Sequence, residues 1–333
     1  MRGELAARRA LGVLACAALL SGCAGAPAAL NPQGPVAARI ADLWWLMFAL
    51  AAVIFGGVMG LLAFALFHPR RGEPEPPGEP ARGTGLIVGG GIVMPAAVLL
   101  VVFGFTLWTM TAIAAYAREP AVTVQVTGHQ WWWEVRYPEQ GFTTANEIHI
   151  PAGRPVRLEL ASADVVHNFW VPELHGKVDT VPGHTNTLWL QADQPGVYRG
   201  RCAEYCGTQH ARMELLVVAE PPEQFQAWLE QQQQAPPAPT DPLLARGRQV
   251  FLGSACVYCH AIRGTNATST FGPDLTHLAS RRTLGAGALE NTRANLAGWI
   301  TNPHSVKPGN RMPPVVLNAE DLHALIAYLE SLE

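Results

Sequence analysis

Two long runs without a charged residue constrain this 333-residue chain more than any other feature. Residues 43–67 are 25 uncharged positions in succession, and residues 83–117 are 35. Each run exceeds the roughly 20 apolar residues that an α-helix needs to cross a bilayer. We therefore predict two transmembrane helices, at residues 40–67 and 86–116, because a buried helix of a soluble domain seldom stays uncharged for so long.

The segment between the two runs, residues 68–85, is predicted to be a cytoplasmic loop. It holds five prolines, which disfavour regular structure, and three arginines. Positively charged loops stay on the cytoplasmic side of a membrane. The two helices then form a hairpin, and the sequence on either side of the hairpin lies outside the cytoplasm.

The first 22 residues are predicted to be a signal peptide. Arg8 and Arg9 precede an apolar run that is too short to span a bilayer stably. The run ends in Leu20-Ser21-Gly22-Cys23, which resembles a bacterial lipobox, so we expect cleavage before Cys23 and lipidation of its thiol. A plain signal peptide with an incidental cysteine is the alternative. We expect a multi-pass protein of the bacterial inner membrane, with both soluble domains on the periplasmic face.

The remaining sequence is divided by a shift in composition. Charged residues make up only 15% of the whole chain, against roughly 25% in an ordinary soluble domain. This composition excludes a disordered, coiled-coil or nucleic-acid-binding protein. We predict one exported domain at residues 121–220, a linker at residues 221–242, and a second domain at residues 243–333. The linker starts with a short amphipathic stretch and ends in the low-complexity tether QQQQAPPAPTDP, residues 231–242.

The C-terminal domain carries Cys256-Val257-Tyr258-Cys259-His260, the C-x-x-C-H pattern of covalent haem attachment. Thiols three residues apart can form thioethers with both vinyl groups of a haem c, and His260 then provides an axial ligand. A zinc site is the alternative, but no further cysteine follows to complete one.

The second axial ligand is predicted to be Met312. It lies in Arg-Met-Pro-Pro, where the prolines stiffen a loop that can press the thioether against iron. Ligation by Met and His suits an electron carrier. Three downstream histidines are rivals, and we expect them to be ordinary surface residues: His277, His304 and His323.

The C-terminal domain as a whole resembles a small class I cytochrome c. Phe271-Gly272-Pro273-Asp274-Leu275 is similar to the Gly-Pro-x-Leu turn of that family. Helices are expected at residues 244–252, 296–300 and 319–332. The resemblance implies an all-α domain built around one haem.

The middle domain has the pattern of an all-β fold. Short runs alternate apolar and polar residues and are separated by turns, which favours a sandwich or a barrel. The clearest runs are residues 122–127, 156–160, 188–190, 197–198 and 215–218.

A cluster of soft metal ligands lies near the end of this domain, at Cys202, Cys206, His210 and Met213. Thiolate, thioether and imidazole ligands favour copper. A mononuclear blue-copper loop uses one cysteine, whereas two thiolates can bridge two copper ions and share one electron between them. A redox-active dithiol is the alternative, but it needs neither His210 nor Met213.

With this ligand cluster, the middle domain resembles the copper A domain of subunit II of haem–copper oxidases. Gly128-His129-Gln130-Trp131-Trp132-Trp133 is similar to the aromatic patch of that family, and Val166-His167-Asn168-Phe169-Trp170-Val171-Pro172 is similar to the strand that carries its first histidine ligand. The resemblance implies a cupredoxin-like Greek-key sandwich and a binuclear copper A centre.

The resemblance also assigns roles to individual residues. Cys202 and Cys206 bridge both copper ions. His167 and Met213 complete one copper, while His210 and the backbone carbonyl of Glu204 complete the other. The side chain of Glu204 and Asp179 help to hold Mg²⁺ at the interface with subunit I, and Trp131 is the point of electron entry.

The order of signal, hairpin, copper domain and cytochrome c resembles that of the caa3-type oxidases. This implies subunit II of a proton-pumping terminal oxidase, which is an oxidoreductase, with subunits I and III as partners. A donor such as cytochrome c or another periplasmic carrier reduces haem c, and copper A passes the electrons to the oxygen-reducing centre of subunit I. Tethering by the linker keeps the haem near copper A at high effective concentration.

Three alternatives compete with this interpretation. The first is the electron-entry subunit of a copper A-containing nitric oxide reductase. A quinol oxidase subunit II lacks the copper ligands, so residues 202–213 oppose it. A stand-alone membrane-tethered electron carrier, or a protein that delivers copper, needs only one anchor, so the hairpin opposes it.

Overall fold

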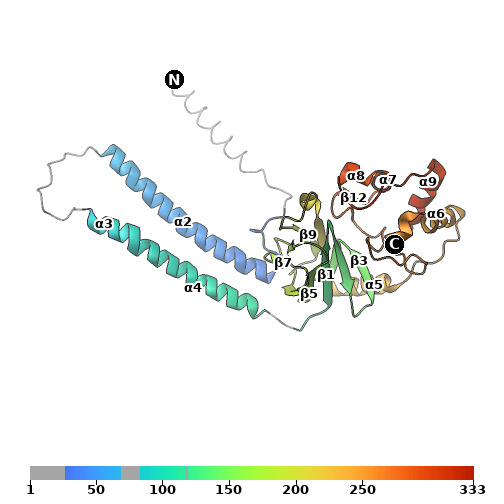
Figure 1. Ribbon diagram of the computed structural model, residues 1–333. Helices are drawn as coiled ribbons and strands as arrows, with labels where there is room; N and C mark the ends of the chain where they lie inside the picture. Colours follow the sequence, from blue (N-terminus) through green and yellow to red (C-terminus); the bar gives the residue numbers. More distant parts are fainter. Residues whose placement is uncertain (1–26, 69–82, 117–118) are drawn as a thin grey trace, which may run out of the picture.

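The computed structural model describes residues 27–68, 83–116 and 119–333. They form a long helical hairpin, a β-sandwich and a small helical domain, in that order along the chain (Figure 1). The signal peptide, the lipidation site Cys23 and most of the cytoplasmic loop, all predicted from the sequence, lie outside the described residues.

The hairpin consists of two apolar helical segments that lie side by side (Figure 1). Helix α2 begins at Pro35, five residues before the predicted start at residue 40. Pro35 fits the first turn of a helix, where its missing N–H is not needed. The second segment is one continuous span of 31 residues, Thr84–Ala114, and it is π-helical where three glycines follow one another. The first helix is α2 (Pro35–Phe67). The second segment consists of α3 (Thr84–Val88), η1 (Gly89–Val93) and α4 (Met94–Ala114).

Both segments are long and apolar enough to cross a membrane, and their central side chains are exposed in the described part of the chain. The start of α2 is different, because Val36 and Ala37 are buried. Just before it, Gln33 donates its N–H to the carbonyl of Glu173 (2.7 Å) and accepts from the N–H of Asp193 (2.8 Å). The hairpin is therefore attached directly to the sandwich.

The sandwich is built from two five-stranded sheets, with strand orders β3-β2-β1-β5-β8 and β4-β10-β9-β6-β7. Within each sheet one pair of strands is parallel, β1 with β5 and β10 with β4, and the other pairs are antiparallel. The strands are β1 (Thr123–His129), β2 (Trp132–Tyr137), β3 (Phe142–Ala145), β4 (Glu147–Pro151), β5 (Val156–Ser162), β6 (His167–Trp170), β7 (Val178–Thr180), β8 (Asn186–Leu190), β9 (Gly196–Cys202) and β10 (Glu214–Glu220).

The alternating pattern of the sequence becomes the inside and the outside of this sandwich. Along β1, every second side chain is buried and its neighbours are half-buried. The core between the sheets contains large side chains from both of them, among them Trp133, Leu158 and Phe169. This arrangement confirms the expected all-β domain, because period-two alternation places one set of side chains on each face of a strand.

Much of the predicted low-complexity linker is a helix of the sandwich. Helix α5 (Pro222–Gln233) buries Phe225 and Leu229 against the core, and its Trp228 ring stacks on His149 at 4.0 Å. Only residues 234–241 separate α5 from the next helix. The glutamine run ends α5, because glutamine is a good helix former and the prolines begin only after it.

The helical domain follows the linker and confirms the expected cytochrome c architecture, apart from a β-ladder of two residues per strand. Its first and last helices pack closely, as do the helices that line its core. The elements of this domain are α6 (Pro242–Gly253), η3 (Ala255–Tyr258), β11 (Thr283–Leu284), β12 (Leu289–Glu290), α7 (Arg293–Thr301), α8 (Pro303–Val306) and α9 (Ala319–Glu330). One further short element, η2 (His210–Arg212), lies in the sandwich between β9 and β10.

The crossing of α6 and α9 depends on Gly247. A Cβ atom at this position would lie 2.0 Å from the carbonyl oxygen of Ala324 and 2.6 Å from Cβ of Tyr328. Real atoms cannot approach a backbone so closely, so the two helices touch only because residue 247 has no side chain.

We predict that Gly247→Val destabilises the helical domain strongly. Forcing α6 away from α9 costs at least the ~1–3 kcal/mol that is typical of an overpacked core. The matched control is Gly298→Val in α7, where a Cβ meets nothing within 4 Å. Calorimetry of the two full-length variants tests this, and equal midpoints for thermal unfolding of the domain would contradict the account of the helix crossing.

Candidate metal centre and haem pocket

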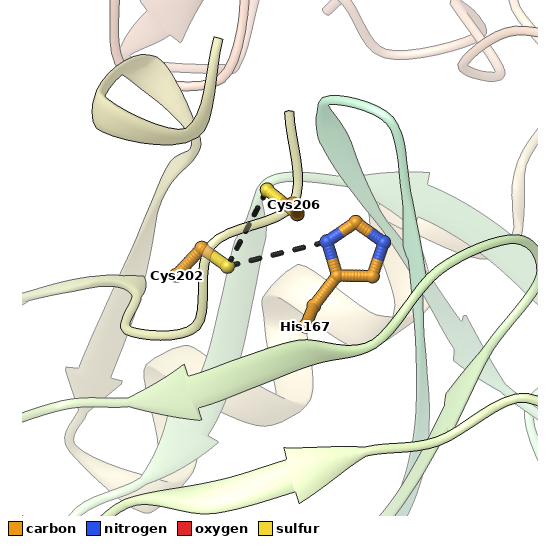
Figure 2. Close-up of side chains that lie close together, drawn as sticks. All are labelled: His167, Cys202 and Cys206. Carbon is orange, nitrogen blue, oxygen red and sulfur yellow. Dashed lines mark hydrogen bonds between the residues drawn. The ribbon is translucent and has the colours of Figure 1, made fainter. Parts of the chain in front are cut away.

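The loop between β9 and β10 brings the two cysteines of the sandwich together. Figure 2 shows Cys202 and Cys206 facing each other beside the ring of His167, which comes from β6 in the same sheet. The two sulfur atoms are 3.7 Å apart, and Cys202 Sγ lies 4.0 Å from His167 Nδ1. Because a disulfide needs about 2.05 Å between sulfurs, both thiols are free.

The remaining predicted ligands surround the same pair of sulfurs. Cys206 Sγ lies 3.7 Å from His210 Nδ1 and 3.8 Å from Met213 Sδ. On the other side, Cys202 Sγ lies 3.1 Å from the backbone oxygen of Glu204. The cluster offers two thiols, two imidazoles, a thioether and a carbonyl, which is a donor set suited to copper. Two cysteines, and not one, lie between the two histidines in the sequence, so two thiolates are available to bind two copper ions.

The structure adds Asp164, which sequence reasoning missed. Its Oδ1 lies 2.8 Å from His167 Nε2, so the far nitrogen of the ring is held and Nδ1 turns toward the thiols. Such partners behind a metal ligand fix its tautomer and orientation. In the sequence, an aspartate three residues before a histidine is too common to be recognised as part of a site.

Hydrogen bonds within the cluster favour a thiolate. The hydrogen bond that the two cysteines share lowers the pKa of Cys202 and raises that of Cys206, and His167 lowers the pKa of Cys202 further. Burial alone would lower the pKa of His167, but its hydrogen bonds to Cys202 and Asp164 together raise it. Because metals bind the thiolate and not the thiol, Cys202 is prepared for a soft cation, whereas Cys206 gives up its proton when the cation binds.

The aromatic loop at residues 128–133 is hydrogen-bonded to residues 202–213, the loop that carries the predicted copper ligands and is called the copper loop below. Trp131 donates its Nε1–H to the carbonyl oxygen of Cys206 at 3.0 Å, and the side-chain amide of Gln130 donates to the same oxygen at 2.8 Å. Gly207 makes the close contact possible, because a Cβ there would lie 2.9 Å from the Trp131 ring, and its φ of +115° favours glycine. Trp131 is therefore fixed to the backbone of Cys206, one of the two predicted copper-binding cysteines.

The two predicted magnesium ligands are placed on the surface. Asp179 accepts a hydrogen bond from Asn168, its partner across the β6–β7 pair, at 2.6 Å. The side chain of Glu204 is exposed and accepts from the N–H of Tyr205. In the described part of the chain the two carboxylates make no contact with each other, and the magnesium site stays a prediction.

A cavity of about 540 Å³ lies in the helical domain and opens toward the sandwich. Four of its lining residues are those predicted to attach and ligate a haem: Cys256, Cys259, His260 and Met312. His260 donates from Nδ1 to the carbonyl of Pro273 at 2.7 Å, which leaves Nε2 as the nitrogen for a metal. Burial lowers the pKa of His260, so the ring is neutral, as ligation requires.

The three rival histidines are absent from the lining of this cavity. One expectation is wrong, because His277 is buried, with 5% of its surface exposed, and is not a surface residue. Its two ring nitrogens contact the backbone oxygens of Glu333 and Gln234, which closes the C-terminus over the linker. His304 is half-buried, and His323 is exposed near Arg293.

The residues that line the cavity fit a haem in charge and in polarity. Arg281 lines it and is 8% exposed, and its Nε has no hydrogen-bond partner within the described residues. A buried guanidinium with a free donor calls for an anion, and haem carries two propionates. Apolar residues line much of the remaining wall, among them Leu275, Leu296, Ile300 and Leu325.

Comparison with known proteins identifies the families of the two soluble domains. A family model described as cytochrome c oxidase subunit II, periplasmic domain, matches residues 140–220, and a cytochrome c model matches residues 244–333. Subunit 2 of the cytochrome c oxidase of Alkalihalophilus pseudofirmus is 39% identical over 328 residues, 94% of each chain. The corresponding subunit of Bacillus sp. (strain PS3) is 33% identical over 344 residues, 95% of each chain.

One solved structure is also similar. The crystal structure of the periplasmic domain of subunit II of the Bradyrhizobium japonicum cytochrome oxidase is 29% identical, with a TM-score of 0.34. The match covers 35% of this chain and 96% of that chain.

We predict that Asp164→Asn weakens copper binding by about 10- to 100-fold, the usual effect of losing a partner behind a metal ligand. The amide removes the charge that orients His167, while the bulk of the side chain stays the same. Competition with a chelator of known affinity measures the change. Asp193→Asn, at an exposed aspartate of the same domain, is the control. Equal copper affinity in both variants would contradict this role.

Proposed function

The chain belongs to the family of cytochrome c oxidase subunit 2 proteins with an attached cytochrome c domain, and on this basis we propose how its residues carry electrons. It is a membrane-anchored, electron-transferring part of a haem–copper oxidase. The two domain families imply copper A and haem c. What we propose beyond this is the ligand set, the number of metal ions, the orientation and the donor.

The proposed copper site holds two ions. Cys202 and Cys206 would hold both ions between them, because both thiols are free and face each other at 3.7 Å. His167 and Met213 would complete one ion, and His210 and the carbonyl of Glu204 would complete the other. When bound, the copper pair and the haem each take up and release single electrons.

At the proposed haem site, Cys256 and Cys259 would attach the haem, and His260 and Met312 would ligate its iron. The hydrogen bond from His260 to Pro273 holds the imidazole in place. Asn310 accepts the N–H of Met312 at 2.8 Å and so shapes the loop that presents the thioether. A periplasmic donor, such as a cytochrome c, delivers electrons to this domain.

Trp131 is the proposed link between the two sites. It lines the mouth of the haem pocket and also donates its Nε1–H to the carbonyl of Cys206. A single residue therefore contacts both sites. An electron that passes through Trp131 has to cross fewer gaps between atoms that are not bonded to each other.

The convergence of four further donor groups, two imidazoles, a thioether and a carbonyl, on one pair of thiols is the observation that carries this proposal. A quinol oxidase subunit needs no such ligands, and a stand-alone carrier needs no second helix. We further propose that both soluble domains lie on the periplasmic side, that Cys23 is lipidated, and that Glu204 and Asp179 hold Mg²⁺ against subunit I.

We predict that Cys206→Ser in the assembled oxidase reduces oxygen uptake to background, because the oxygen of serine is a poor bridging ligand for copper. The content of covalent haem is expected to be unchanged, since the haem pocket lies in the other domain. Tyr205→Phe is the control, because this exposed neighbour in the same loop is outside the ligand set.

Oxygen uptake and nitric oxide consumption are measured on the same purified complex. Uptake at the normal rate in Cys206→Ser would contradict the copper assignment. Consumption of nitric oxide in place of oxygen by the unmodified complex would move the protein to the reductase group.

A further inference from the structure

The two domains meet around a lysine in a chain that hardly uses lysine. There are 21 arginines and only two lysines, Lys177 and Lys307. Lys177 is exposed, whereas Lys307 has only 2% of its surface exposed. A buried amine is unfavourable unless its N–H groups donate hydrogen bonds. The burial of Lys307 therefore needs a structural explanation.

Lys307 connects the helical domain to the aromatic loop of the sandwich. Its Nζ donates to the carbonyl oxygen of Trp131 at 2.8 Å and to that of Gly285, in its own domain, also at 2.8 Å. Burial lowers the pKa of Lys307 to about 7, but charged or neutral, the amine has two N–H groups for these two carbonyls. Five residues later in the same loop comes Met312.

A second buried group reaches across in the opposite direction. Glu147, at the start of β4 in the sandwich, is 3% exposed. Its Oε1 accepts the N–H groups of Arg282 (2.6 Å) and Thr283 (3.2 Å), both in the helical domain. In the adjacent turn, the N–H of Glu214 donates to Ala286 at 3.0 Å. Each domain thus satisfies polar groups that the other buries.

The contact is close and extends to the copper loop. A Cβ on Gly287, whose φ is +81°, would lie 2.6 Å from Cβ of Glu214. Gln209, within the copper loop, donates its amide to the carbonyl of Pro308 at 2.7 Å. At the linker, Arg263 donates to the carbonyl of Gln232 at 2.8 Å. The helical domain is therefore held at several separate points.

We propose that Lys307 and Glu147 lock the cytochrome c domain onto the copper domain in one docked position, with Lys307 as a positioning residue that holds the mouth of the haem pocket at Trp131. This deepens the proposed function and rests on it. The linker composition predicts a domain that swings on a tether. The buried contacts describe instead a domain that stays in place, so that electron transfer between the sites does not wait for an encounter.

Labelling with an amine-reactive ester tests the docking directly, and Lys177 is an internal reference. In the purified full-length chain, we expect Lys177 to react promptly and Lys307 at least tenfold more slowly. Both should react alike once the chain is denatured. Mass spectrometry of the peptides gives the two rates. Equal rates in the native chain would overturn the proposal, and this readout does not depend on electron flow.

Variants then test the positioning role. Lys307→Met in the assembled oxidase should slow electron arrival at copper after photoreduction of the haem by at least tenfold. The absorbance of the haem and the EPR spectrum of the copper should be unchanged. Lys177→Met is the matched control and should transfer at the normal rate. An unchanged transfer rate in Lys307→Met would overturn the role.

Glu147→Leu, which removes the acceptor oxygen that a glutamine would retain, keeps the proposal testable if Lys307→Met fails to bind haem. This change lies in the other domain, and we expect it to raise the labelling rate of Lys307 at least several-fold. No change in that rate would show that Glu147 does not hold the docked position. If electron transfer fails in the unmodified protein while Lys307 stays protected, the proposed function is wrong but the docking is right.

Discussion

The carbonyl oxygen of Cys206 accepts two hydrogen bonds, and the arrangement of both sites depends on them. Gln130 and Trp131 are the donors, and they fix the aromatic loop to the backbone of a cysteine that we propose binds copper. Lys307 then binds the carbonyl of that same tryptophan from the other domain. One short chain of contacts therefore sets the position of the haem pocket relative to the copper loop, without any contribution from the membrane helices.

The two ends of the sandwich serve different purposes. One end receives the helical domain through Glu147 and the copper loop. Elsewhere, the segment that leads into α2 pairs its backbone with Glu173 and Asp193, which attaches the anchor rigidly. The hairpin and the cytochrome c domain lie on opposite sides of the sandwich, so the sandwich is the body that relates the membrane anchor to the electron-accepting domain (Figure 1).

Local patterns in the sequence were sufficient to predict most of the elements and to show which candidate ligands lie together. The uncharged runs gave two helices, alternation gave strands, and the spacing of Cys202, Cys206, His210 and Met213 placed four groups that do meet in space. Contacts between distant segments could not be read this way. Asp164 and Lys307 have no spacing that marks them, and the glutamine run read as a tether because composition alone does not show that Trp228 packs on the core.

The central claim is that the loop between β9 and β10 holds two copper ions bridged by two thiolates. The EPR spectrum of the copper-loaded, partly reduced full-length chain tests it most directly. We expect one unpaired electron whose hyperfine structure requires two equivalent copper nuclei, at two copper ions per chain. A spectrum from a single copper nucleus, or a chain that retains no copper after reconstitution, would contradict the account.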